Sequence, residues 1–144
     1  MLSQRGHYAL RALLVLAANG EGAPMRTPQI ARAAGLSPKF LEVILLELRK
    51  AGLLRSFRGC KGGFVLARPA AEITFADIVQ VTDGSLALSA CVCPVAYAPC
   101  KHCFNELYCE IRSALSRAQD MTTAVLKSFD LAGAASRMQA AGKL

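Results

Sequence analysis

Five cysteines lie close together in the second half of the chain, with the spacing Cys91-x-Cys93-x6-Cys100-x2-Cys103-x5-Cys109. Cysteine thiolates bind zinc and iron–sulfur clusters, and both need three or four ligands that a short segment can supply. A single x2 pair would be weak evidence, whereas five thiols within nineteen residues predict a metal site. The sixth cysteine, Cys60, stands apart and is not expected to bind metal.

Three kinds of chemistry suit these thiols. An iron–sulfur cluster, with either two or four irons, fits a soft and thiolate-rich site. A structural zinc ion held by four thiolates is the second, and a thiol–disulfide switch is the third. His102 lies between two of the cysteines and is a further candidate ligand, although a histidine in such a place more often faces solvent. The residue types alone leave the choice open.

An enzymatic function is also worth weighing, because Cys100-x-x-Cys103 imitates the motif of a thiol oxidoreductase. That motif works within a βαβ pattern, which this sequence does not show, so no enzyme is predicted. A small redox or electron-transfer protein that does not bind DNA would explain the cysteines. It would not explain the cations that fill the first half of the chain.

The 144-residue chain has a formal net charge of +7, and this charge is concentrated in the first half. Residues 1–68 hold eleven Lys and Arg against three Glu, a balance of +8, whereas residues 69–144 hold six against seven acidic residues, a balance of −1. A concentration of cations on one part of a chain favours an anionic partner such as nucleic acid. The first half is therefore the candidate DNA-binding part.

Three predicted helices precede a basic hairpin in this half. Apolar residues at helical spacing predict the first helix over residues 4–18. Thr27 is expected to cap the second helix, with Pro28 in its first position. Ser37 is expected to cap the third helix, which ends at Gly52. The short turn between the second and third helices is typical of a helix-turn-helix.

The hairpin follows as two short apolar runs, residues 53–57 and 64–67, around a glycine-rich and basic turn. A further helix is predicted over residues 74–84, where Thr74 and Asp77 have the spacing of a capping box. Three helices followed by a hairpin make a winged helix-turn-helix. The predicted fold class is therefore mainly α, with a small β-hairpin wing and a long C-terminal helix described below.

The expected DNA contacts come from the N-terminus of the third helix, the hairpin tip and three further arginines: Ser37, Pro38, Lys39, Phe40, Arg58, Gly59, Lys61, Arg5, Arg26 and Arg55. The helix would enter the major groove through its first residues. Arg58 is expected to reach a minor groove, and the three further arginines are expected to contact phosphates. For Phe40, a place in the core is an equally good alternative.

The second half predicts a loop and then a long helix. Residues 85–103 show no periodicity and contain two prolines, so they need a bound group to order them. The helix is expected from residue 104 to about residue 130. Its apolar stripe consists of Leu107, Ile111, Leu115, Ala118, Thr122, Val125, Leu126 and Phe129. One small domain offers too little surface to cover a stripe of this length, which predicts a homodimer through a partner helix.

These elements divide the chain into three parts. Residues 1–84 form the DNA-binding domain, residues 85–103 the cysteine-rich loop, and residues 104–144 the dimerisation helix with an alanine-rich tail. No run reaches the roughly 18 uncharged apolar residues of a membrane span. Near the N-terminus, Arg11 interrupts an apolar run that has helical rather than signal-peptide character. We therefore expect a cytoplasmic protein in a reducing compartment, where structural disulfides are rare.

Four segments carry a resemblance to a known family: RGHYALRALLVLA at 5–17, LSPKFLEVILLELRKAGLL at 36–54, SFRGCKGGFVLARP at 56–69 and EITFADIVQVTDG at 72–84. They resemble the Rrf-type winged-helix regulators, a bacterial family of IscR- and NsrR-like iron–sulfur sensors. The resemblance covers most of the chain, and the first-helix and hairpin motifs are specific. It implies a homodimer, formed by the long helix, that binds a pseudo-palindromic operator in double-stranded DNA.

The resemblance also implies an iron–sulfur cluster held by three cysteines about five residues apart, with a fourth ligand from elsewhere in the chain or from a partner subunit. Cys103 and Cys109 match the last interval of that pattern, and the first position falls on Cys93 or Cys91. Cys100 has no counterpart, so the ligand set stays open and one chain could supply all four ligands. The implied function is transcriptional regulation, with operator affinity controlled by a cluster that senses redox, nitric oxide or iron–sulfur status.

Overall fold

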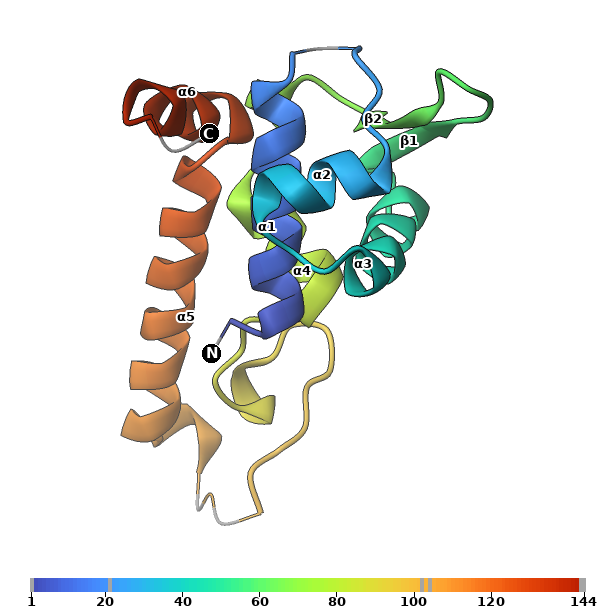
Figure 1. Ribbon diagram of the computed structural model, residues 1–144. Coiled ribbons are helices and arrows are strands. Elements are labelled where there is room, and N and C mark those ends of the chain that lie inside the picture. Colours follow the sequence, from blue (N-terminus) through green and yellow to red (C-terminus); the bar gives the residue numbers. More distant parts are fainter. Residues whose placement is uncertain (1, 21, 102, 104, 143–144) are drawn as a thin grey trace.

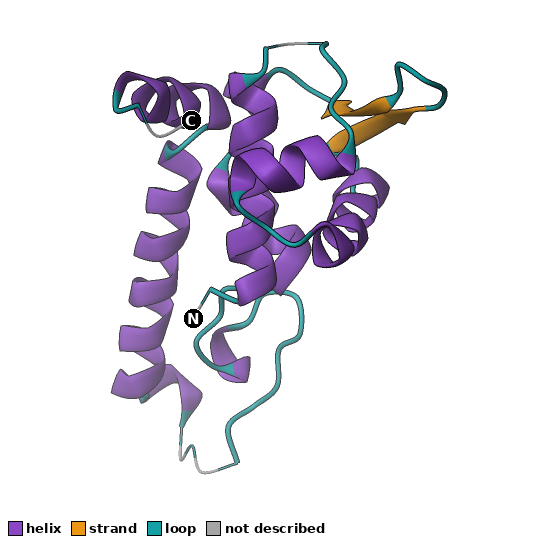
Figure 2. Cartoon of the chain, viewed as in Figure 1, coloured by secondary structure: helices purple, strands orange, loops and turns teal. Residues whose placement is uncertain are grey.

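The computed structural model describes residues 2–20, 22–101, 103 and 105–142, which form six α-helices and one two-stranded sheet (Figures 1 and 2). The elements in chain order are α1 (Gln4–Ala18), α2 (Thr27–Ala34), α3 (Pro38–Lys50), β1 (Leu54–Phe57), β2 (Gly63–Leu66), α4 (Phe75–Asp83), α5 (Glu110–Ser128) and α6 (Leu131–Ala140). This architecture confirms the predicted mainly α fold with a winged helix-turn-helix. In the described residues, no helix is both long and apolar enough to span a bilayer.

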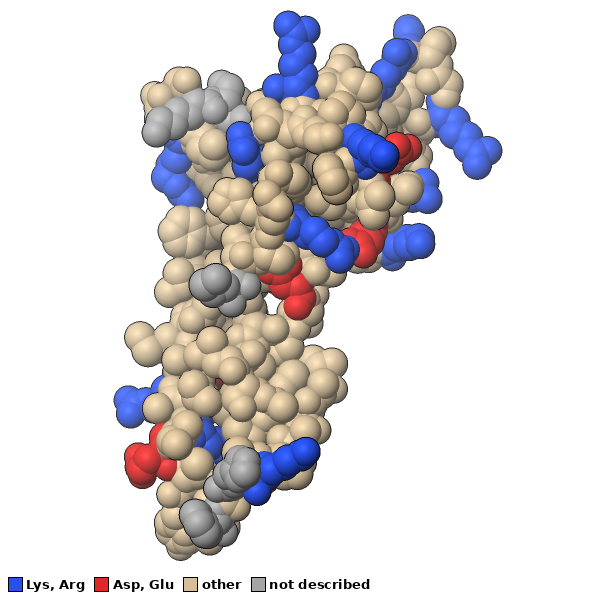
Figure 3. All heavy atoms as spheres, turned by 60° about the horizontal axis from the view of Figure 1, so that its bottom comes forward, with Lys and Arg blue, Asp and Glu red and all other residues tan. Residues whose placement is uncertain are grey.

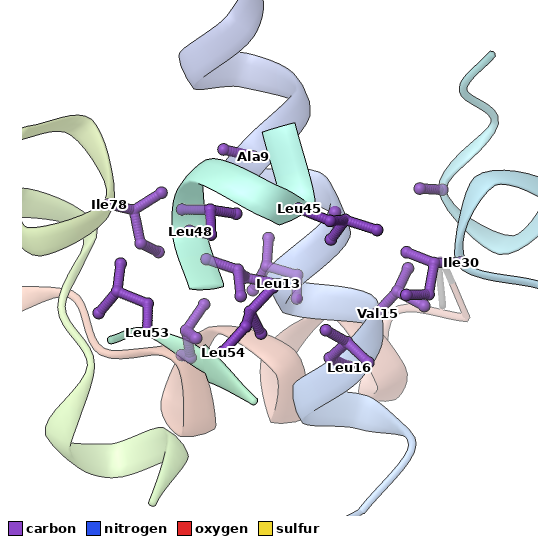
Figure 4. Close-up of a cluster of buried hydrophobic side chains, with 14 of the residues drawn as sticks. Ala9, Leu13, Val15, Leu16, Ile30, Leu45, Leu48, Leu53, Leu54 and Ile78 are labelled. Carbon is purple, nitrogen blue, oxygen red and sulfur yellow. The ribbon is translucent and has the colours of Figure 1, made fainter. Parts of the chain in front are cut away.

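Helix α1 lies at the centre of the winged-helix part of the molecule. Ala9, Ala12 and Leu13 are fully buried, and residues 12–16 are buried on every side of the helix. Helices α2, α3, α4 and α6 all pack against it. Figure 4 shows Leu13 among side chains from α3 and β1, including Leu48 and Leu54. The core therefore fixes α3 and the wing relative to one central helix.

The helix caps agree with the sequence in part. Thr74 and Asp77 form the predicted capping box of α4, with the Thr74 N–H donating to Asp77 Oδ2 at 2.9 Å. The prediction that Thr27 caps α2 is wrong, because Thr27 is already helical and the cap is Arg26, whose N–H donates to the Gln29 side chain at 2.8 Å. Ser37 occupies the N-cap position of α3, although its side chain makes no capping hydrogen bond.

The wing is an antiparallel hairpin in which Leu54 faces Leu66 and Phe57 faces Gly63. The chain before α2 joins its edge, because the Met25 N–H donates to the Phe64 carbonyl at 3.0 Å and the Phe64 N–H donates back at 2.8 Å. A Cβ atom at Gly63 would lie 2.5 Å from the Met25 carbonyl oxygen. Glycine is therefore required for this close approach.

Helix α5 begins later than the sequence predicts. Residues 105–109 are not part of the helix: Leu107 lies in a 3-10 turn, Glu106–Tyr108, and Cys109 is the N-cap of α5. The Cys109 sulfur accepts the N–H of Arg112 at 3.5 Å and so satisfies one of the free donors of the first turn. Since the apolar spacing continues through Leu107 past this cap, periodicity alone could not locate the helix start.

An apolar stripe of α5 is exposed except at Ala118, which is half-buried. We call it the α5 seam, and it consists of Ile111, Ala114, Ala118, Met121 and Val125. These residues follow the alternating three- and four-residue spacing of a coiled-coil seam. Ile111, Met121 and Val125 are 73%, 71% and 57% exposed, and no residue of α5 is buried. Part of the predicted stripe, including Leu115 and Leu126, is instead half-buried beside the seam.

The segment after α5 returns to the core, so that the alanine-rich tail forms helix α6 against α1 (Figure 1). Leu131 is fully buried, and its N–H donates to the Ile73 carbonyl at 3.0 Å. The rings of Phe75 and Phe129 lie 5.8 Å apart at the same junction. One end of α5 is therefore anchored to the winged helix, while its other end carries the cysteine loop.

Candidate functional site

The DNA contacts predicted at the start of α3 all lie on the surface. Ser37, Pro38, Lys39 and Phe40 are exposed. Phe40 is 66% exposed, so its alternative placement in the core is wrong. The first helical turn also presents backbone N–H groups that α3 itself cannot satisfy, and these favour an anion. An exposed cation and a free helix N-terminus therefore lie together here, and both suit the phosphate backbone of DNA.

The tip of the wing carries the second set of predicted contacts. Arg58, Gly59 and Lys61 are exposed in the turn between β1 and β2. Gly59 has a φ of 99°, which side chains rarely adopt, so glycine is what permits the tight turn. The Arg26 guanidinium donates to the Cys60 carbonyl, which brings a third predicted cation to the wing. Cys60 itself is exposed and remote from the other cysteines in the sequence.

The remaining two predicted phosphate contacts differ from one another. Arg55 is exposed on β1. Arg5 forms an ion pair with Glu47 of α3, and the hydrogen bond and charge of Glu47 raise the pKa of Arg5. The structure therefore brings Arg5 to the side of α3, with its charge partly neutralised, rather than presenting it as a free cation.

Charge is unevenly distributed over the surface. On the face in Figure 3, the Lys and Arg side chains project mainly from the upper, winged-helix part, and fewer lie around the lower end that holds the cysteine loop. On α3 and the wing, Arg49 Nη1 donates to Ser56 Oγ at 3.0 Å and links the two elements. The candidate DNA surface thus combines exposed cations of α3 and of the wing, two elements that contact each other.

One feature of this face was missed by the sequence analysis. Val43, in the middle of α3, is 60% exposed, and Leu46 one turn further is 37% exposed. The core positions of α3 are Leu41, Ile44, Leu45 and Leu48. Since these four positions define the inner side of the helix, the sequence periodicity places Val43 on the outer side, where its apolar side chain is a signal of a contact surface.

The cysteine loop contains two buried thiols. Cys91 and Cys93 lie at a 3-10 turn, Ala90–Val92, that packs near α5. The Cys93 sulfur accepts the N–H of Ala96 at 3.3 Å. Its pKa is lowered by a hydrogen bond from the Ser85 side chain and by backbone N–H groups that include Ala96. The local backbone thus favours the thiolate form at Cys93.

A second pair of thiols lies at the start of α5. Burial, and then the neighbouring Cys109 thiol, raise the pKa of Cys103. The pKa of Cys109 is lowered, chiefly by the N–H of Arg112 in the first turn of the helix. Cys109 is therefore the better thiolate of the pair.

Arg112 connects the two pairs. Its side-chain Nε donates to the Cys91 carbonyl at 3.1 Å while its backbone N–H bonds to the Cys109 sulfur. Cys91, Cys93 and Cys109 all line one open pocket of about 620 Å³, whose wall also includes Arg112. Cys100 is exposed in the turn that leads to Cys103, and His102 lies outside the described residues.

The thiols of the loop are chemically suited to an iron–sulfur cluster, but the structure does not place them around one centre. Thiolates are the ligands that iron–sulfur clusters use, and three of them already border one pocket. Within the described parts of the chain, however, no three Cys, His, Asp or Glu side chains are placed to hold one metal ion together. Cys91 and Cys93 lie at one 3-10 turn and Cys103 and Cys109 near the start of α5, so the described thiols do not form a closed ligand set.

Comparison with known proteins agrees with this fold and these features. The family model described as "Rrf2: Iron-dependent Transcriptional regulator" matches residues 2–136. An rrf2-like HTH-type transcriptional regulator of Rhodobacter capsulatus is 38% identical over 122 residues, which cover 81% of this chain and 79% of that protein.

Two solved structures are similar over nearly the whole chain. CymR, the global cysteine regulator of B. subtilis, has a TM-score of 0.78 and 31% identity, covering 95% of this chain and 97% of that one. IscR of T. potens has a TM-score of 0.71 and 32% identity, covering 92% and 83%. The chain therefore belongs to the Rrf2 family and is a DNA-binding transcriptional regulator, not an enzyme.

Proposed function

We propose that this regulator binds a pseudo-palindromic operator as a homodimer, and that an iron–sulfur cluster on the cysteine loop controls its affinity. The observation that carries the proposal is the position of Cys109. It is both a member of the thiol group and the N-cap of α5, the helix whose exposed seam suits a partner. A change at the thiols therefore acts directly on the helix that would set the dimer geometry.

DNA binding through α3 and the wing is supported by the exposed cations of these two elements. Lys61 is assigned a phosphate contact and Arg58 a contact in the minor groove, where the potential of A·T-rich DNA attracts arginine. Lys61→Ala should then weaken binding to all sequences and reduce the salt slope by about one. Arg58→Ala should instead reduce the preference for the operator. If both variants bound a promoter fragment like the wild type, the surface would be wrongly assigned.

Homodimer formation is supported by the α5 seam. Large apolar side chains exposed in a regular repeat are costly in water unless another surface covers them. The two alanines at its centre let a second helix approach closely, and a two-fold dimer would pair each seam with its own copy. Such a dimer also presents two copies of α3, which matches the symmetry of a palindromic operator.

The cluster would be held by thiolates in the order of preference Cys109, Cys103, Cys93, Cys100 and Cys91. Support comes from the donor chemistry, the shared pocket and the family description as iron-dependent. When bound, an iron–sulfur cluster supplies sensitivity to oxidants, nitric oxide and iron supply at its iron–thiolate bonds. Because no three of the described thiols are placed to hold one metal ion, binding requires the loop to draw them together. Ordering of residues 91–109 is the expected consequence.

The coupling between loop and operator needs no contact between the two. Half-sites on DNA lie about 34–36 Å apart, so a small change in the separation of the two α3 helices weakens binding. A coupling of about 1–3 kcal/mol gives roughly a 5- to 150-fold change in affinity. Helix α5 is the two-state element that this requires, because its start can shift while α6 anchors its other end.

A thiol–disulfide switch is the second candidate, because Cys103 and Cys109 are close enough for each to shift the pKa of the other. A structural zinc site is the third. Protein purified without air separates the three: a visible spectrum with iron and sulfide supports the cluster, colourless protein with stoichiometric zinc supports the zinc site, and metal-free protein with a mapped Cys103–Cys109 disulfide after oxidation supports the switch. For the cluster, Cys103→Ala and Cys109→Ala should abolish the spectrum, and Cys60→Ala should leave it unchanged.

A further inference from the structure

The outward face of α3 has an unusual composition for a surface that meets DNA. Lys39, Val43, Leu46 and Lys50 occur at spacings of four, three and four residues, opposite the buried side of the helix. The two ends of this row are cations and its middle is apolar. Phe40 lies beside the row and is 66% exposed.

Of these apolar side chains, Val43 and Phe40 are mostly exposed, whereas Leu46 is largely covered. Val43 is 60% exposed, and together with Phe40 and Tyr8 it borders a hollow of about 430 Å³ between α3 and α1. Helix α3 buries its other face against the core, so the exposure is not due to a loosely held helix. An exposed apolar patch of this kind marks a contact surface.

The flanking charges indicate what the patch contacts. Lys39 and Lys50 at its two ends match the two phosphate backbones that border a groove of DNA. Between those backbones the major groove presents hydrogen-bonding groups and one apolar group, the 5-methyl of thymine. A fully apolar partner would leave both lysines without a counter-charge.

We infer that Val43, with Phe40 beside it, recognises thymine through its methyl group in each operator half-site. The inference rests on the proposed function, in which α3 lies in the major groove. It adds a specificity determinant: Lys39 and Lys50 hold the helix by phosphates, and Val43 distinguishes thymine from cytosine or from a thymine without its methyl. Burial of one CH₂-sized group contributes about 0.8 kcal/mol, or roughly a fourfold change in affinity.

The test uses DNA that differs by the methyl group alone. The loaded wild-type protein first selects binding sequences from a random pool of double-stranded oligonucleotides. Each thymine of one selected sequence is then replaced by deoxyuridine, and the dissociation constant of every duplex is measured. We expect at least one thymine per half-site at which loss of the methyl weakens wild-type binding about fourfold.

Val43→Ala should lose most of that difference at the same position, while still binding the operator. Val43→Thr, which keeps one methyl and the branched shape, checks that any effect is not caused by misfolding. Val95→Ala is the matched control, since Val95 is 77% exposed but lies on the cysteine loop. It should keep the wild-type response to deoxyuridine.

The possible failures are distinguishable. If the protein selects a sequence but no deoxyuridine weakens binding, or if Val43→Ala responds like the wild type at every thymine, the inference is overturned and the proposed function stands. If no sequence is selected from the pool by either the loaded or the cluster-free protein, operator binding itself is refuted.

Discussion

Met121 lies in the middle of the α5 seam, and its replacement by alanine tests whether this seam joins two chains. The side chain is 71% exposed, so about seven-tenths of it is available to a partner. Complete burial of a methionine side chain contributes about 1.5–3 kcal/mol, and the available part therefore about 1–2 kcal/mol. A two-fold dimer contains this contact twice, so the total is about 2–4 kcal/mol.

Because alanine keeps the Cβ, we expect an effect near 2 kcal/mol, which raises the dimer dissociation constant about 30-fold. Sedimentation velocity over a series of protein concentrations measures that constant directly. Leu88→Ala is the matched control, because Leu88 is 59% exposed but lies outside α5. It should dimerise like the wild type. An unchanged constant for Met121→Ala, or an equal loss for Leu88→Ala, would refute our assignment of the seam.

Three further predictions concern the core, the N-terminus and the cysteine loop. Leu13→Ala, at a fully buried position of α1, should lower the free energy of unfolding by about 2–5 kcal/mol in a urea titration. Burial raises the pKa of Asp83, but hydrogen bonds from Ser3 outweigh it and leave the pKa lowered. The wild type should therefore be more stable than Asp83→Asn at neutral pH, and this advantage in the free energy of unfolding should shrink as the pH falls below about 4. Arg112→Gln should reduce dibromobimane cross-linking of Cys91 to Cys109 in apo-protein, whereas Arg117→Gln on the same pocket should not.

The winged-helix part could be predicted well because its signals are local and its core is regular. Residues 4–18 form α1 as expected, since apolar residues at helical spacing in the sequence indicated a helix, although the structure buries residues 12–16 on all sides. The hairpin followed from two apolar runs around glycines. In contrast, the start of α5 depends on a hydrogen bond to one sulfur, and periodicity does not register a cap of this kind.

The candidate site was harder to predict because its geometry depends on contacts between distant residues. Arg5 is basic and near the N-terminus, but only the fold shows that Glu47 of α3 pairs with it. Likewise, the loop has no periodicity, so the sequence could not show that Arg112 would tie Cys91 to the start of α5. Composition could suggest residue types for the site, but which of them are free depends on tertiary packing.

The central claim, that the state of the thiols controls operator affinity, is tested most directly by one anaerobic titration. The same selected operator is titrated with cluster-loaded protein and with protein from which iron has been removed by a chelator, at one salt concentration. A coupling of about 1–3 kcal/mol predicts dissociation constants that differ roughly 5- to 150-fold between the two states. Equal constants would contradict the account, because the cluster would then be structural and the start of α5 would not transmit its loss to the DNA-binding face.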